Sequence, residues 1–249
     1  MLLKDKVALL YGGGGAIGSA VAHAFAREGA SVYLAGRTQE KLDKVAAEIQ
    51  ADGGMVETAV LDALNEEAVN SFVDDVATQT GHIDISFNVI GYQDVHKLLS
   101  EITVEEFLQP IVTAARTQFL TTRAAARHMT VRGSGVILHF GGGGPQTTPG
   151  LGGFKVALDA VESLRRQWAL ELGPYGIRVI TLKTGGIPET IPDDFQGKEQ
   201  IINNLLPLTQ LKRMATLADV GHVAAFAASD YAQSITATDI NISCGAIVD

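Results

Sequence analysis

The stretch YGGGGAIG, residues 11–18, decides how this chain is expected to fold. It joins a short apolar run, 6–11, to a segment with apolar residues at helical spacing, 16–30. Gly12 permits a tight turn, and Gly18 lets the helix lie close to the sheet. The glycines between them leave room for a pyrophosphate to reach backbone N–H groups at the helix N-terminus. A purely structural turn between a strand and a helix is the alternative interpretation.

The alternation of strand-like and helix-like segments continues along the chain. Further strands are expected at 31–36, 55–63, 83–91, 135–140, 177–183 and 238–243, and further helices at 38–54, 65–81, 104–130, 151–172 and 216–229. Successive βα units form a parallel sheet with helices on both faces. The sequence therefore predicts one α/β domain over residues 1–249, built on a doubly wound, Rossmann-type sheet whose ligands bind beyond the carboxyl ends of the strands.

The composition argues against several functional classes. The 249 residues are 46% hydrophobic and 19% charged, which is typical of a globular protein. A net charge of -9 disfavours a nucleic-acid partner. One cysteine, Cys244, excludes an internal disulfide framework, and no cluster of ligand side chains has metal-binding spacing. Because neither a signal peptide nor an apolar run of about 18 residues occurs, we expect a cytoplasmic protein without a membrane partner.

The ends of the second and third expected strands bear on which nucleotide would bind. Gly36 offers no carboxylate for a ribose 2′-hydroxyl, and Arg37 follows it. A guanidinium fork suits a 2′-phosphate, which favours NADP(H) over NAD(H). A solvated surface arginine is the alternative. Asp62, at the end of the third strand, is placed either to accept a hydrogen bond from an adenine amino group or to cap the next helix.

Over nearly its whole length the chain resembles the classical short-chain dehydrogenase/reductase family. The glycine motif of the family is matched at Tyr11, Gly12, Ala16 and Gly18, with alanine for its middle glycine. The Asn-Asn-Ala-Gly motif after the fourth strand becomes NVIG, which keeps Asn88 and Gly91. Residues 207–245 resemble the closing helix and strand of the family.

The resemblance implies a nicotinamide dinucleotide cofactor and hydride transfer to or from a carbonyl or hydroxyl substrate. The residues it assigns to the cofactor are Gly12, Gly14, Gly15, Ile17, Gly18, Arg37, Asp62, Asn88, Gly91, Lys155, Gly185 and Ile187. Segment 187–206 matches the variable substrate lid of the family, although a packed surface helix fits it equally. The resemblance also implies a homodimer or homotetramer that pairs the helices near 104–130 and 152–172.

The catalytic motif of the family is kept at only one of its four positions. Lys155 remains, but Leu151 stands where the family has its proton-donating tyrosine. Gly142, or the neighbouring Gly141, takes the place of the serine and Ala114 that of the asparagine, in an alignment that also shortens the loop before Leu151. None of these three side chains moves or orients a proton.

Other side chains near the expected site carry protons. Tyr92 follows Gly91, and His139 lies near the end of the fifth strand; both are candidate proton donors. A half-buried wall tyrosine and a hydrogen-bonded core histidine are the structural alternatives. His96, in the loop after Tyr92, is a further polar residue nearby. Lys155 is expected to contact the ribose, with direct action as an acid as the alternative.

Two functions remain open from the sequence. The first is an NADP(H)-dependent oxidoreductase with a displaced proton donor, acting on an unidentified small molecule. Hydride transfer depends mainly on cofactor and substrate being held together, so turnover survives loss of an acid at a reduced rate. The second is a catalytically inactive pseudoenzyme that binds the cofactor and has a regulatory or structural role.

Overall fold

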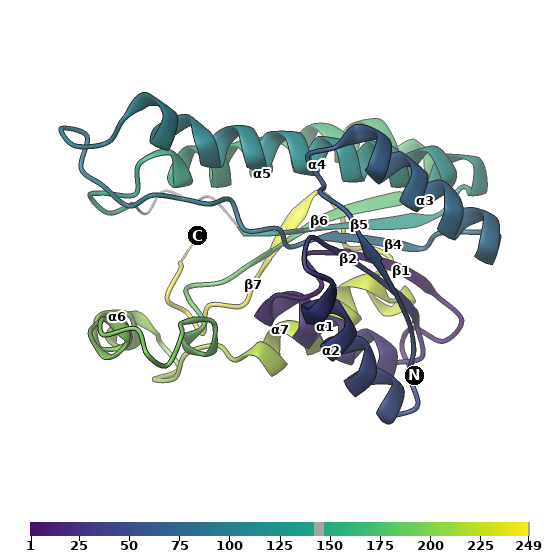
Figure 1. Ribbon diagram of the computed structural model, residues 1–249, viewed down its shortest axis with the longest axis horizontal. Coiled ribbons are helices and arrows are strands. Elements are labelled where there is room, and N and C mark those ends of the chain that lie inside the picture. The colour runs from purple at the N-terminus through teal and green to yellow at the C-terminus, as the bar shows by residue number, and fades with distance from the viewer. Residues whose placement is uncertain (142–146, 249) are drawn as a thin grey trace.

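The computed structural model describes residues 1–141 and 147–248, which contain one parallel sheet of seven strands. Its order is β3-β2-β1-β4-β5-β6-β7 (Figure 1). The strands are β1 (Val7–Tyr11), β2 (Ser31–Gly36), β3 (Met55–Val60), β4 (Ile85–Asn88), β5 (Gly135–Phe140), β6 (Ile177–Lys183) and β7 (Thr238–Asn241). The chain runs outward from β1 to β3 and then returns to β4 on the other side of β1. This reversal confirms the predicted doubly wound fold.

Helices cover both faces of the sheet. The main ones are α1 (Ala16–Arg27), α2 (Gln39–Ala51), α3 (Glu66–Thr80), α4 (Val104–Arg132), α5 (Gly153–Leu172), α6 (Lys198–Leu205) and α7 (Leu217–Ala228). Helices α3, α4 and α5 lie on one face, and α1, α2 and α7 lie on the other (Figure 1). Helix α6 projects beyond the sheet. In the described part of the chain, no helix is long and apolar enough to cross a membrane.

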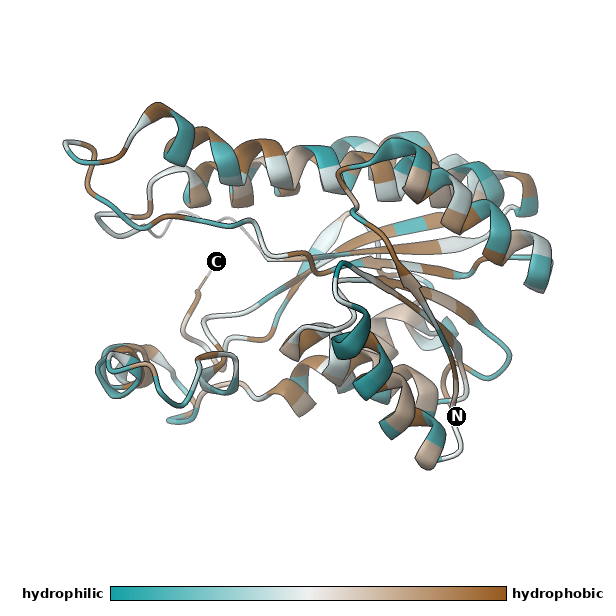
Figure 2. Cartoon of the chain, in the orientation of Figure 1, coloured by the Kyte–Doolittle hydropathy of each residue, from teal (hydrophilic) through white to brown (hydrophobic). Residues whose placement is uncertain are grey.

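The core consists of two apolar layers separated by the sheet. In β1, Leu9 and Tyr11 pack with the helices of the α3–α5 face, whereas Ala8 and Leu10 pack on the other side. Successive side chains of a strand point to opposite faces, so a strand covered on both sides is apolar throughout. Figure 2 shows the resulting hydrophobic interior between the two helix layers.

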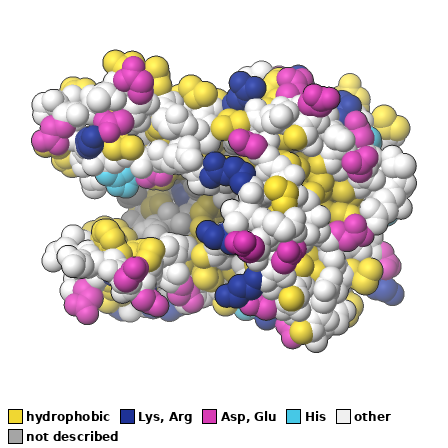
Figure 3. All heavy atoms as spheres, in the orientation of Figure 1, with side chains coloured by type: hydrophobic (Ala, Val, Ile, Leu, Met, Phe, Trp, Pro, Cys, Tyr) yellow, Lys and Arg dark blue, Asp and Glu magenta, His cyan; other side chains and the backbone are white. Residues whose placement is uncertain are grey.

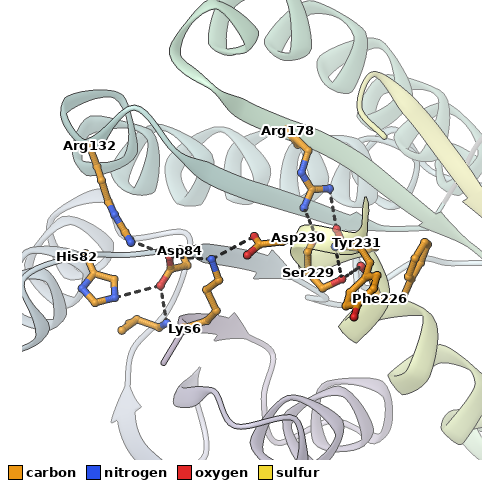
Figure 4. A network of polar contacts seen from close by, with 11 residues as sticks. Lys6, His82, Asp84, Arg132, Arg178, Phe226, Ser229, Asp230 and Tyr231 are labelled. Carbon is orange, nitrogen blue, oxygen red and sulfur yellow. Dashed lines mark hydrogen bonds and ion pairs between the residues drawn. The ribbon is translucent and has the colours of Figure 1, made fainter. Parts of the chain in front are cut away.

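A buried carboxylate ties elements together at the amino end of the sheet. Asp84, just before β4, accepts hydrogen bonds from the Val7 backbone N–H at 2.8 Å and from Arg132 of α4 at 2.7 Å. Lys6 lies 3.9 Å from Asp84 and 3.3 Å from Asp230 (Figure 4). These contacts join β1, β4, α4 and the segment after α7 at the end of the sheet opposite the cavity described below.

Arg178 connects further elements at the same end of the sheet. Arg178 of β6 donates hydrogen bonds to the backbone oxygens of Ala227, Ser229 and Ile235 (Figure 4). Burial lowers its pKa, while the charge of Asp230 raises it. Because a helix leaves its last carbonyls without partners, this arginine satisfies the carboxyl end of α7.

Helices α4 and α5 pack closely enough to require a glycine at the start of α5. A Cβ atom on Gly153 would lie 1.8 Å from the backbone oxygen of Phe107 and 3.0 Å from the Pro110 ring. A backbone atom cannot move aside as the end of a flexible side chain can. The spacing of the two helices therefore depends on the missing side chain.

We expect Gly153→Ala to lower the free energy of unfolding by about 2 to 3 kcal/mol, because overpacking against backbone forces the two helices apart. Urea denaturation followed by circular dichroism measures the change. Gly173→Ala is the matched control, since a Cβ at this exposed helix end meets nothing within 4 Å. Equal stability of the two variants would contradict the close contact.

Candidate functional site

The turn between β1 and α1 is built from backbone alone. Gly12 has a φ of +86°, a conformation that favours glycine, and a Cβ on it would lie 3.0 Å from the Val89 backbone oxygen. A Cβ on Gly18 would lie 2.2 Å from the Gly12 oxygen. Helix α1 begins after Gly15 without a side-chain cap and has no acidic residue in its first turn. Its first N–H groups are therefore left for an anion.

A cavity of about 380 Å³ opens at this turn, where the strand order reverses between β1 and β4. The predicted residues that line it are Gly12, Gly14, Gly15, Arg37, Asp62 and Gly91. A Cβ on Gly14 would lie 2.9 Å from the Cβ of Lys41, so this wall can only be backbone. The walls fit a dinucleotide, because bare glycine backbone and an uncapped helix meet in one cavity.

The rim of the cavity carries a second cation that the sequence analysis missed. Lys41, in the first turn of α2, lines the cavity together with Arg37. Both residues are exposed, and neither forms an ion pair within the described residues. The signal was present in the sequence, since Lys41 follows Arg37 by four residues at the start of an expected helix.

Asp62 also lines the cavity and does not cap the next helix. Its Oδ1 atom accepts a hydrogen bond from the Leu64 N–H at 3.0 Å. The cap of α3 is Asn65, whose side chain accepts a hydrogen bond from the Ala68 N–H at 3.1 Å. Thr38, Gln93, Thr113 and Thr117 are further polar lining residues that the sequence analysis did not single out.

Several predicted cofactor residues do not line this cavity. Asn88 is buried, where its Nδ2 donates a hydrogen bond to Thr121 of α4 and its Oδ1 accepts one from the Ile90 N–H. It therefore braces β4 against α4. The others that do not line the cavity are Ile17, Gly18, Lys155, Gly185 and Ile187. Of these, Ile187 packs in the core with Ala215.

The residues predicted at the catalytic positions have the following surroundings. Ala114 is fully buried in a small cluster with Tyr92 and Ala157. Leu151 is half-buried just before α5 begins. Lys155 is held by Asp159, one turn further along the helix, with 2.6 Å between Nζ and Oδ1. Gly142, the predicted replacement of the serine, lies outside the described residues.

The two predicted proton donors are both buried. The Tyr92 hydroxyl donates a hydrogen bond to the Phe140 backbone oxygen at 3.3 Å, and burial raises the pKa of Tyr92 to about 12. His139 lies edge-on to Trp168, and neither of its ring nitrogens has a hydrogen-bond partner among the described residues. Burial, helped by the charge of Arg165, lowers the pKa of His139 to about 3. At neutral pH Tyr92 therefore keeps its proton and His139 carries no charge.

Beyond the cavity the molecule is hollowed between two lobes. Figure 3 shows this hollow, with basic side chains near its inner end. Comparison with Figure 1 places the segment after β4 and the first turns of α4 and α5 above it, and α6 below it. In residues 1–141 and 147–248, no three side chains of the metal-binding types cluster in a way that could hold an ion.

Known proteins share both the sequence pattern and the fold. The profile of a family described as enoyl-(acyl carrier protein) reductase matches residues 14–246. The chain is 30% identical to a 7alpha-hydroxysteroid dehydrogenase of Clostridium sardiniense, over 94% of this chain and 90% of that protein.

Solved structures agree with this result. A short-chain type dehydrogenase/reductase from Mycobacterium ulcerans superposes with a TM-score of 0.92 at 26% identity, over 99% of this chain and 91% of the other. An NAD+-bound xylitol dehydrogenase superposes with a TM-score of 0.90 at 25% identity, over 98% and 100% of the two chains. From the shared sheet, the glycine turn and these similarities together, the chain belongs to the short-chain dehydrogenase/reductase family of oxidoreductases, which bind a nicotinamide dinucleotide.

Proposed function

We propose that this protein is an NADP(H)-dependent oxidoreductase that transfers a hydride between the cofactor and a small carbonyl or hydroxyl compound. One observation carries the choice of cofactor. Arg37 and Lys41 stand on the rim of the cavity, just after β2, and form no ion pair with any residue that the structure describes, while Gly36 offers no carboxylate. Two free cations complement the 2′-phosphate that distinguishes NADP(H) from NAD(H).

The remaining cofactor contacts follow from the walls of the cavity. The backbone of Gly12, Gly14 and Gly15 and the N-terminus of α1 would hold the pyrophosphate. Asp62 would accept a hydrogen bond from the adenine amino group. Gly91 lines the cavity beyond β4, on the side toward the expected nicotinamide site. The other residues assigned by resemblance do not line this cavity.

Lys155 is the residue of the family's catalytic motif that we propose remains in use. Its amine would contact the nicotinamide ribose, for which it must exchange its partner Asp159 for a ribose hydroxyl. Both groups are partly exposed, so this exchange costs little. Tyr92 and His139 remain candidate proton donors, but each would first have to overcome its burial.

A cofactor-binding pseudoenzyme is the second candidate. The apolar cluster of Ala114, Tyr92 and Ala157 favours it, because polar groups of the family's motif give way there to close packing. A protein that binds the nucleotide without performing a reaction needs the nucleotide cavity but not the proton relay. In this case the bound nucleotide would serve a regulatory or structural role.

We also propose that segment 187–206 covers the substrate. It includes α6, none of whose residues is buried, and Phe195 and Leu206 expose apolar surface nearby. Gly186, with a φ of +111°, stands just before the segment, and a Cβ there would lie 2.9 Å from the Leu205 side chain. An apolar flap next to the hollow suits a substrate with a hydrophobic body.

A homodimer or homotetramer that pairs α4 and α5 with a second copy completes the proposal. Exposed apolar side chains on one side of α4 support it: Val104, Leu108, Val112 and Phe119. Helix α5 adds Val156. Burial of such a stripe against a second copy removes apolar area from water in both chains.

The cofactor proposal predicts a preference that calorimetric titration measures. NADPH should bind more tightly than NADH, and Arg37→Ala and Lys41→Ala should each weaken NADPH binding about 10- to 100-fold, since each removes one charged hydrogen bond. NADH binding should change little in either variant. Lys44→Ala, on the same helix but away from the cavity, is the control of matched charge. A preference for NADH would overturn the assignment.

The enzyme and the pseudoenzyme differ in turnover. We expect the unmodified protein to oxidise NADPH slowly with a panel of aldehydes, ketones and diketones. The double variant Leu151→Tyr with Gly142→Ser should be faster by up to about 100-fold, because it restores general acid help. NADPH absorbance at saturating nucleotide reports both rates. Tight NADPH binding without turnover in either protein would favour the pseudoenzyme.

The oligomer proposal predicts that Val112→Glu lowers the mass in solution to that of one chain, because a carboxylate would be buried in the interface. Sedimentation equilibrium measures the mass. Val131→Glu is the control, since Val131 is 90% exposed and lies on the other side of α4. A one-chain mass for the unmodified protein would contradict the proposal.

A further inference from the structure

A histidine and an aspartate form a pair on the segment after β4. Neither residue belongs to a motif that the chain shares with the short-chain dehydrogenase/reductase family. The Nε2 atom of His96 lies 2.8 Å from Oδ2 of Asp94. The His96 side chain is 56% exposed and that of Asp94 31%, so the imidazole is accessible while the carboxylate is partly sheltered. With Nε2 facing the carboxylate, the other ring nitrogen, Nδ1, has no hydrogen-bond partner within the described residues.

The backbone around His96 lies against the backbone around Leu151. A Cβ on Gly152 would lie 3.0 Å from the Val95 oxygen, and one on Gly150 would lie 3.8 Å from the Lys97 carbonyl carbon. The backbone on either side of His96 therefore lies close to the backbone on either side of Leu151. His96 is thereby brought next to the position where the resemblance expects a proton-donating tyrosine.

The ring of His96 also lies near the start of α5. The His96 ring lies 5.8 Å from the Phe154 ring, tilted by 39°. Phe154 directly precedes Lys155, and its other neighbour is Tyr92 at 6.3 Å. The Phe154 ring therefore lies near both the buried Tyr92 and the exposed His96.

The backbone is strained at Gln93, which lies between Tyr92 and His96 in the chain. Gln93 has a φ of +57°, which is uncommon for a residue with a side chain. Such conformations cost free energy and persist where the surrounding structure requires them. Here the turn follows the buried Tyr92 and precedes the exposed pair.

We propose that His96, oriented by Asp94, is the proton donor that takes the place of the missing tyrosine. The inference rests on the proposed oxidoreductase function and deepens it. Histidine is the side chain most often used to transfer protons in enzymes, and the carboxylate of Asp94, 2.8 Å from Nε2, fixes the orientation of the ring. His96 is the catalytic residue of the pair, and Asp94 is a positioning residue.

The step balances in atoms and electrons. A reduced nicotinamide dinucleotide supplies a hydride, which is a hydrogen with two electrons, to the carbonyl carbon of the substrate. The π electrons of the C=O bond move to its oxygen, which takes one proton from the His96 imidazolium. The product is an alcohol, and the neutral imidazole regains its proton from water through its exposed edge. In the direction of alcohol oxidation the same imidazole accepts the proton.

The first test measures position and needs no turnover. Signals from the rings of the six histidines are recorded by proton–carbon NMR and assigned with His96→Gln and His23→Gln. Only the oxidised nicotinamide ring carries a positive charge, so the His96 signals should differ between saturating NADP+ and NADPH. His23, which pairs with Glu48 at 3.2 Å on an exposed surface, is the control and should not respond. Binding of both nucleotides without a difference at His96 would overturn the inference.

The second test measures chemistry. His96→Gln should lower kcat by about 100-fold while leaving NADPH affinity and KM nearly unchanged, and free imidazole should restore part of the rate. Asp94→Asn should cause a smaller loss and have no further effect when His96 is already glutamine. His23→Gln should keep the full rate.

The outcomes separate the two proposals. Full turnover in His96→Gln overturns the role of His96 and leaves the proposed oxidoreductase standing. Tight NADPH binding without turnover in the unmodified protein overturns both.

Discussion

The close approach of helix α1 to the turn after β1 is the contact on which the rest of the structure depends. A single Cβ at Gly18 would lie 2.2 Å from the Gly12 oxygen, so only glycine lets the helix start there. Once docked, α1 offers its other side to α7, where a Cβ on Gly221 would lie 3.0 Å from the Cβ of Ala24. The same docking aims the uncapped N-terminus of α1 at the cavity. One steric constraint thus sets both the packing of a helix layer and the geometry of the nucleotide site.

The two ends of the sheet use charge in opposite ways. At the amino end, Asp84 is surrounded by hydrogen-bond donors and Arg178 by backbone carbonyls, so these charged groups connect elements of the fold. At the carboxyl end, Arg37 and Lys41 stand on the rim of a cavity without an ion-pair partner in the described residues. Satisfied charges stabilise a fold, whereas unpaired ones at a cavity favour a ligand of opposite sign.

Apolar packing surrounds Tyr92 at the inner end of the site. Ala114 leaves space that Tyr92 fills, and the hydroxyl of this tyrosine is bound to a backbone oxygen. Ala157 and Val161 complete this compact apolar cluster. Accessible polar groups remain on its outer side, at His96 and Asp94.

The sequence by itself determined the sheet, its switch point and the glycine turn, because strand and helix periodicity and the steric needs of glycine are local properties. It also located Arg37 and Asp62 at the ends of strands. Only the tertiary structure decided which polar groups are accessible: His139 and Tyr92 are buried, Lys155 is held by Asp159, and Asn65 caps α3 in place of Asp62. Burial and partners depend on contacts between residues far apart in the chain, as where segment 95–97 meets 150–152. No spacing within one segment records such contacts.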